Sequence, residues 1–250
     1  MFKAYYFLWR RRGMCRDDFI AYYENAHVDL LRDNLPHPAD FRRNYPLWSR
    51  GAAAAVGVTP PFDVLTAMTS LSQATFEEGF LAYVAQPFHD VVVEDEERFT
   101  NRAMVKLTTV DEVIDGAAER DWFPAPVLPG EGTKLVRFLR RPLGLEPDAF
   151  REAYETSAAP AVAALSEGCI DYRRNYVRTG DDHFFMTPDL ASALDDDALL
   201  HCDLVEELCF VDGDHAAAAA VALDAAPPPA SVVGVRRTPA TTCTQHLREG

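Results

Sequence analysis

The sequence repeats itself once, and this internal repeat is the feature that most constrains the fold. Residues 3–45 align with residues 134–176 at a constant offset of 131 positions and without a gap, and 14 of the 43 aligned residues are identical. Ordinary residue usage would give roughly one chance match in sixteen. The clearest match sets DFRRNY at 40–45 against DYRRNY at 171–176. The repeat therefore predicts two copies of one structural unit.

Both copies contain segments with strand-like alternation and segments with helical periodicity. Their order in each copy is strand, helix, strand, strand, helix, strand, which is the order of a ferredoxin-like unit. We therefore predict an α+β fold, in which two tandem ferredoxin-like βαββαβ units pack their antiparallel sheets into an intramolecular α+β barrel. The predicted strands are 2–10, 41–47, 62–71, 103–110, 133–141, 170–178, 202–211 and 231–238, and the predicted helices are about 16–35, 75–84, 147–166 and 214–225.

The repeat also predicts the domain boundaries. Residues 1–114 form the first unit, and residues 133–240 form a second, degenerate copy. Residues 115–132 contain three prolines and two late glycines and are predicted as the linker. Residues 241–250 are predicted as a polar tail, and 179–200 as a long acidic loop within the second unit.

Composition excludes several classes of function. The net charge is −15, from 24 basic and 39 acidic residues, and such a chain repels nucleic acid and anionic membrane surfaces. The five cysteines are odd in number and lack CxxC spacing, so we expect reduced thiols in a cytoplasmic protein. The apolar N-terminal stretch is too short for a signal peptide or a membrane span.

No motif for a nucleotide cofactor or a metal is present in the sequence: GxGxxG, GxxxxGK[ST], HExxH and spaced His/Cys sets are all missing. We therefore predict neither a cofactor nor a metal. Two sheets that close a barrel would instead form an apolar pocket with a few polar groups, which suits a small hydrophobic or aromatic substrate. The aromatic residues expected to line it are Tyr5, Tyr6, Phe7, Trp9, Tyr22, Tyr23 and Tyr45.

His27 is the predicted catalytic residue. It continues the apolar stripe of Phe19 and Tyr23 at helical spacing, so it is expected on the buried face of the first helix. An imidazole can give and take a proton near neutral pH. The second copy has Ala158 at the aligned position, so the packing of the unit does not demand a histidine. The alternative is a core histidine whose hydrogen bonds are satisfied within the fold.

Further residues are candidates for auxiliary or substrate-binding roles. Arg43, Asn44 and Tyr45 recur in the second copy, which favours a shared structural task over anion or carbonyl binding. His89 is expected in a loop, either at the mouth of the pocket or exposed. The acidic run at 94–97 is expected to be a solvated face, with Asp95 turned inward to pair with Arg98 or an arginine on a strand. The complete auxiliary set is Tyr6, Trp9, Tyr23, Arg43, Asn44, Tyr45, His89 and Asp95.

At these residues the first copy resembles the EthD family of the dimeric α+β barrel superfamily. The matching pieces are residues 11–27, 41–45, 62–63 and 94–99, and His27 stands where that family places its helix histidine. The resemblance implies a barrel that relatives build by homodimerisation and that this chain builds as a fused pair. It leaves open whether the fused pair dimerises further. It also implies several activities: cofactor-independent monooxygenases, polyketide cyclases, decarboxylases, isomerases and, as an outlier, haem enzymes.

The sequence favours a cofactor-independent lyase, decarboxylase or isomerase that uses His27 as general acid/base on an aromatic or polyketide-like molecule. A cofactor-free monooxygenase of a phenolic substrate is the second hypothesis. A non-enzymatic binding protein for a hydrophobic metabolite is the third. Oxygen consumption separates the first two hypotheses, and the absence of any product identifies the third.

Overall fold

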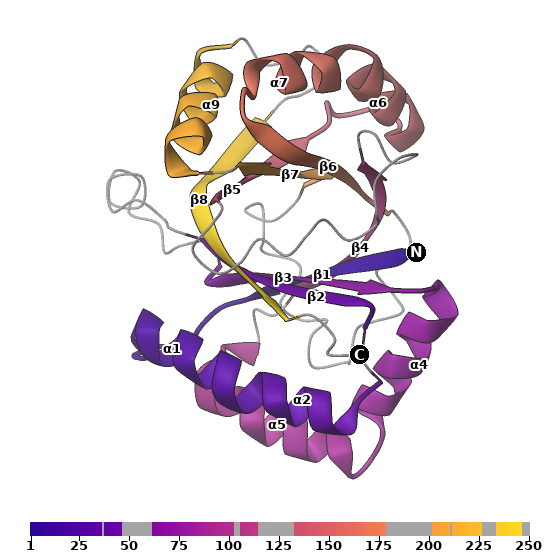
Figure 1. The fold of residues 1–250 in the computed structure, drawn as a ribbon. Coiled ribbons are helices and arrows are strands. Elements are labelled where there is room, and N and C mark those ends of the chain that lie inside the picture. The colour runs from indigo at the N-terminus through magenta and orange to yellow at the C-terminus, as the bar shows by residue number, and fades with distance from the viewer. Residues whose placement is uncertain are drawn as a thin grey trace.

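The computed structural model describes residues 1–36, 38–46, 62–102, 106–114, 133–178, 202–210, 212–226 and 234–246. Within this part of the chain, eight antiparallel strands form a closed barrel in the order β1-β3-β2-β8-β5-β7-β6-β4 (Figure 1). The predicted linker and the acidic loop at 179–200 lie outside the described residues. The strands are β1 (Phe2–Leu8), β2 (Asp40–Tyr45), β3 (Val64–Ser70), β4 (Lys106–Ile114), β5 (Thr133–Arg140), β6 (Cys169–Val177), β7 (Leu204–Phe210) and β8 (Gly234–His246).

Each half of the chain contributes four strands, and its first strand pairs with its third, which pairs in turn with its second. The two fourth strands close the barrel because each pairs with both halves. Residues 106–110 of β4 pair with β1 and residues 110–114 pair with β6. In the same way, β8 pairs with β5 over 234–241 and with β2 over 242–246. The predicted polar tail is therefore wrong at its start, because the strand continues to His246.

The helices cover the outside of the barrel in two groups, one against each half (Figure 1). In the N-terminal half α1 (Arg16–Tyr22), a π-helical turn (Tyr23–His27) and α2 (Val28–Asn34) form one continuous helix, beside α4 (Gln73–Val84) and α5 (Phe88–Phe99). The C-terminal half carries α6 (Pro147–Ala153), a second π-helical turn (Tyr154–Ala158), α7 (Ala159–Leu165) and α9 (Gly213–Ala225).

Helix α5 is absent from the predicted helices, and it occupies the place of the expected loop at His89 and of the acidic run at 94–97. Its buried residues are Val92, Asp95, Glu96 and Phe99, a spacing that follows one face of a helix. Glu94 and Glu97 are exposed, so the acidic run is divided between two faces. His89 lies in the first turn of this helix and not in a loop.

The sheet divides the aromatic residues that the sequence places in one pocket. Tyr5, Phe7 and Trp9 lie inside the barrel, in a cluster with Phe62 and Phe138. The helix-facing cluster holds a different set, with Leu8, Phe19, Tyr23, Tyr45 and Phe99. The expectation of one aromatic pocket is therefore wrong, because successive side chains of a strand point to opposite faces.

Paired charges occupy the barrel interior beside the aromatic rings. The carboxylate of Glu207 accepts hydrogen bonds from Lys3 at 2.8 Å and Lys134 at 2.6 Å, and from the hydroxyl of Tyr5. Lys3 also donates to Glu112 at 2.6 Å. All of these groups are buried, so each charge depends on its partners to offset the cost of desolvation.

Candidate active site

The helix that carries His27 widens into a π-helical turn over Tyr23–His27. The N–H of Val28 bonds the carbonyl of Tyr23, five residues earlier, where an α-helix would use the carbonyl of Glu24. The second half has the same turn, in which the N–H of Ala159 bonds the carbonyl of Tyr154. Because the turn persists where Ala158 replaces histidine, it belongs to the architecture that both halves share.

Side chains that recur in both halves hold this turn against the sheet. Arg43 donates two hydrogen bonds to the carboxylate of Glu24, at 2.8 and 2.7 Å, and the Tyr45 hydroxyl donates a third. In the second half the residues equivalent to Arg43 and Tyr45 both donate to Glu155, at 2.8 and 2.6 Å. Asn44 lies on the opposite face of its strand, where its side-chain amide donates to a backbone carbonyl of β3 at 2.9 Å.

His27 and Asp95 form a buried pair between the π-helical turn and α5. Nδ1 of His27 lies 2.8 Å from Oδ2 of Asp95, and these two residues are 4% and 8% exposed. The hydroxyl of Tyr22 donates to the other carboxylate oxygen, Oδ1, at 2.7 Å. The prediction of Arg98 as the partner of Asp95 is wrong, because Arg98 pairs with Glu94 at 2.6 Å on the exposed face of α5.

The charge of Asp95 fixes the tautomer of His27. Burial raises the pKa of the Asp95 carboxyl, but the hydrogen bonds from His27 and Tyr22 outweigh burial, and the pKa lies below its usual value. An ionised carboxylate can only accept, so Nδ1 carries a proton and the neutral ring keeps its lone pair on Nε2. Among the residues that the structure describes, Asp95 is the one hydrogen-bond partner of this ring.

Aromatic rings hold the imidazole in place. The Tyr23 ring stacks on it with the centroids 5.3 Å apart, and the Phe99 ring lies 4.9 Å away. The hydroxyl of Tyr23 is hydrogen bonded to Oγ1 of Thr66 on β3 at 2.8 Å. These contacts orient His27 on the helix-facing side of the sheet.

The same side of the sheet remains partly open in the N-terminal half. In each of β1, β2 and β3, a single residue is partly exposed: Tyr6, Phe41 and Met68, respectively. All three pack against the helix-facing clusters, and Phe41 and Met68 are cross-strand neighbours. We call these three residues the open patch. A buried strand that exposes aromatic and thioether side chains under its own helices offers an apolar surface to a ligand.

The C-terminal half is closed at the equivalent positions. The matching residues are Arg137, Tyr172 and Leu208, all 5% exposed or less. Nη1 of Arg137 lies 2.8 Å from Oε2 of Glu206, close enough for an ion pair although not aligned as a hydrogen bond. The hydroxyl of Tyr154 donates to Oε1 of the same carboxylate at 2.7 Å.

The described residues of the C-terminal half contain no counterpart of α5, the helix that carries Asp95. Within the described residues, His27 and its acid partner therefore occur in the N-terminal half alone.

The remaining candidates from the sequence lie away from the His27 ring. Trp9 is inside the barrel. His89 stands edge-on to Tyr83, and its Nδ1 is buried without a hydrogen-bond partner in the described part of the chain. Tyr22 is expected from the sequence only as an apolar lining residue. Its contact with Asp95 follows from the packing of α1 against α5, which the sequence does not reveal.

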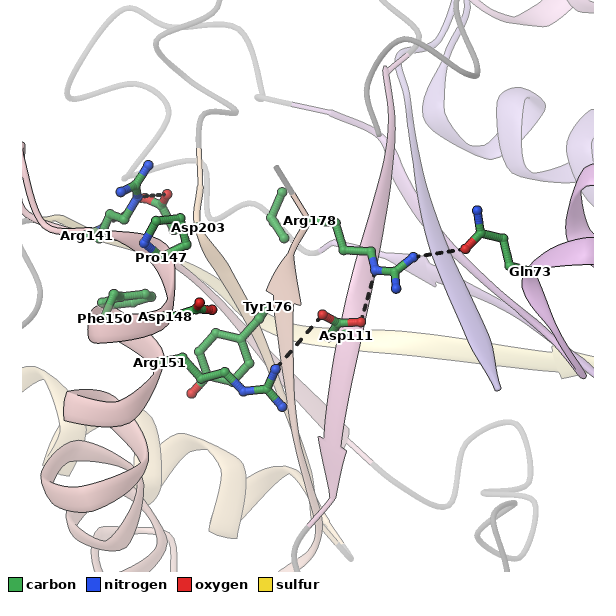
Figure 2. A pocket seen from close by; sticks show the side chains of 11 residues that line it. Gln73, Asp111, Arg141, Pro147, Asp148, Phe150, Arg151, Tyr176, Arg178 and Asp203 are labelled. Carbon is green, nitrogen blue, oxygen red and sulfur yellow. Dashed lines mark hydrogen bonds and ion pairs between the residues drawn. The ribbon is translucent and has the colours of Figure 1, made fainter. Parts of the chain in front are cut away.

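A separate polar pocket of about 410 Å³ lies at the seam between the halves (Figure 2). Nε of Arg178 bonds Asp111 at 3.0 Å, and Arg151 approaches the same carboxylate at 3.9 Å. At the other side of the pocket Arg141 bonds Asp203 at 2.7 Å. Because its arginines face acids of the protein, we interpret this pocket as a structural contact between the two halves.

The described residues contain no group of three or more His, Cys, Asp or Glu side chains placed to hold a metal ion. None of the helices in the described part of the chain has the length and apolarity that a membrane span requires.

Comparisons with known proteins agree with this architecture. Residues 11–103 match the family model of the EthD domain, a range that includes both His27 and Asp95. Among solved structures, the chain is similar to one described as a crystal structure study of an anthrone oxidase-like protein. The TM-score is 0.54 at 10% sequence identity, over 98% of this chain and 92% of the other. At that identity the similarity concerns the fold alone. No curated protein matches the chain.

Proposed function

We propose that this chain is a cofactor-independent enzyme in which His27 is the general acid/base acting on a hydrophobic aromatic or polyketide-like molecule. The observation that carries the proposal is the oriented imidazole: Nδ1 is held by Asp95 at 2.8 Å, which leaves Nε2 for a substrate. The outcome would be a lyase, decarboxylase or isomerase reaction that begins with proton transfer. The match to the EthD domain model supports a small-molecule enzyme.

The geometry suits proton removal for two reasons. First, the hydrogen bond to Asp95 keeps the lone pair of the ring on Nε2, as a general base requires. Second, the carboxylate stabilises the imidazolium that forms when Nε2 takes the proton. Tyr22 holds the carboxylate from its other side, so the pair keeps its orientation while the charge moves. The open patch would place the planar part of the substrate on the same side of the sheet as His27.

We further propose that the two halves are copies of one ferredoxin-like unit, fused so that one chain replaces a dimer. The matching pairing within the halves and the crossing of β4 and β8 support this origin. The barrel closes within a single chain, so a second copy is not needed to complete the sheet. On this proposal the C-terminal half serves as a built-in partner without a site of its own.

The decisive experiment compares the wild type with His27→Ala on a panel of aromatic ketones, phenols and lactones. Product formation and exchange of acidic C–H protons with D₂O are both followed by NMR. Loss of the base is expected to lower turnover by about 10²-fold or more. His215→Ala, which removes an exposed histidine bonded to Asp212, is the matched control and should turn over as the wild type does. Unchanged turnover in His27→Ala would remove the assignment.

A cofactor-free monooxygenase is the second candidate, favoured by the structural similarity to an anthrone oxidase-like protein. In that reaction the carbanion left by proton removal would meet O₂ beside the open patch. Oxygen uptake that depends on the substrate and on His27, without any added cofactor, would select this candidate. Binding of panel members without product or oxygen uptake would instead select a non-enzymatic binding protein.

A further inference from the structure

Tyr6 presents a phenol to the open patch from the central part of β1. Its side chain packs on the helix-facing side, and its cross-strand neighbour is Thr66. The hydroxyl of Thr66 is already bonded to Tyr23 at 2.8 Å. The hydroxyl of Tyr6 has no hydrogen-bond partner among the described residues. A partly exposed phenol in this position is available to a ligand.

The surroundings of Tyr6 keep its phenol protonated. Burial, followed by the neighbouring Tyr23 and Glu96, raises the pKa of Tyr6 above its usual range. The carboxylate of Glu96 does not accept a hydrogen bond from Tyr6. It accepts hydrogen bonds from the hydroxyl of Tyr83 and, at 2.8 Å, from Nε of Arg102. At neutral pH Tyr6 is therefore a neutral donor that lacks an acceptor in the described part of the chain.

The C-terminal half shows that the fold does not require a phenol at this position. Arg137 occupies the matching site on β5, and Glu206, its cross-strand neighbour, neutralises it. That half pairs its two central charges with each other, and its matching positions are buried. The N-terminal half keeps an unused donor beside an accessible apolar surface. From this difference we infer that the donor at Tyr6 serves a ligand and is not required by the fold.

We propose that Tyr6 donates a hydrogen bond to the substrate oxygen on which negative charge develops, so that the substrates are phenols and enolisable aromatic ketones. The inference rests on the proposed role of His27. Nε2 of His27 takes the proton of the substrate, and the electron pair of the broken C–H or O–H bond is delocalised onto the conjugated oxygen. That oxygen then accepts a hydrogen bond from the hydroxyl of Tyr6. The positive charge on the His27 imidazolium balances the negative charge on this oxygen. The step needs no oxidant.

The test uses 4-nitrophenol, whose absorbance reports its ionised form, with 4-nitroanisole as a neutral probe of similar shape. Loss of a hydrogen bond to a charged group is expected to weaken binding of the nitrophenolate by about 10- to 100-fold in Tyr6→Phe. Binding of nitroanisole should stay within about threefold of the wild type if the apolar surface is intact, since the hydrogen bond is worth little to a neutral ether. Tyr83→Phe removes a hydroxyl that is already bonded to Glu96, and this control should bind both probes as the wild type does.

Equal binding of the nitrophenolate by wild type and Tyr6→Phe would overturn the proposal, as would the absence of binding by the wild type. An equal loss for both probes would also overturn it, since it would indicate a packing effect. The binding assay compares the wild type with Tyr6→Phe and does not need turnover. Failure of the His27 assignment is therefore distinguishable from failure of the Tyr6 assignment.

Discussion

Replacement of Asp95 by asparagine tests the His27 pair without removing the imidazole. The asparagine carbonyl can accept from Nδ1 of His27, while the Tyr22 hydroxyl can turn to accept from the new NH₂ group. The Asp95→Asn side chain therefore fits the site and keeps both hydrogen bonds, but it carries no charge. The change isolates what the carboxylate does for an imidazolium.

The expected magnitude follows from the separation of the groups. Nδ1 and Oδ2 are 2.8 Å apart, which puts the two charge centres roughly 4 Å apart. At an effective dielectric constant of about 20, two unit charges at this separation interact by roughly 4 kcal/mol. Reorganisation and residual solvent reduce this value, so we expect a loss of about 1.5–4 kcal/mol in the transition state. The corresponding fall in turnover is about 10- to 10³-fold.

Two measurements check this prediction. The rate of D₂O exchange into the best substrate of the panel gives the loss of turnover, and ¹⁵N NMR of the imidazole reports its tautomer. Asp90→Asn, the same substitution at an exposed position on α5, is the control and should leave both readouts unchanged. If Asp95→Asn keeps the wild-type exchange rate, the carboxylate does not support a charged His27 and the catalytic pair is refuted.

Two predictions concern stability. The pKa of Asp95 is lower in the folded protein than in the unfolded chain, where it is about 3.9. The Asp95 carboxylate therefore stabilises the fold fully at pH values above about 3.9. This contribution is lost as the pH falls through the folded pKa. Urea unfolding between pH 2.5 and pH 6 should show a smaller gain in stability for Asp95→Asn than for the wild type, and equal gains would contradict the argument. Arg137→Leu should cost about 2–4 kcal/mol, because it leaves Glu206 buried with only phenol donors, and addition of Glu206→Leu should restore part of the loss. A double variant less stable than Arg137→Leu would count against a buried ion pair as the cause.

The alternation of strand-like and helical segments was sufficient to predict an antiparallel α+β barrel, and the described residues form one. The position of His27 on a buried face also followed from its spacing with Phe19 and Tyr23. The π-helical turn could not be predicted from the sequence, because widening a helix by one residue leaves the apolar stripe almost unchanged. Its consequence is local: the backbone bond of Val28 moves to Tyr23, and the turn recurs without a histidine in the other half.

The partner of His27 could not be predicted. The sequence of an acidic run does not show which of its side chains are buried until the buried face of its helix is known. Asp95 and Arg98 are three residues apart, and the expectation of a pair rested on this short separation in the sequence. The helix instead buries Val92, Asp95 and Phe99 together, and Arg98 turns outward to Glu94. The sequence did contain one indication of this buried face: Val92 and Phe99, two apolar residues seven positions apart, follow Pro87.

The two halves of this chain differ in how they treat a polar side chain on the helix-facing side of the sheet. Both have a polar group at the centre of the sheet beneath a π-helical turn: Tyr6 in the first half and Arg137 in the second. The second half adds Glu206 and closes over the pair, and its described residues include no helix equivalent to α5. The first half leaves Tyr6 without an acceptor among the described residues, keeps its neighbours partly exposed and uses a whole helix to orient one imidazole. A ligand could occupy both this donor and the oriented base. The asymmetry between the halves is therefore itself an argument for one working site, in the N-terminal half.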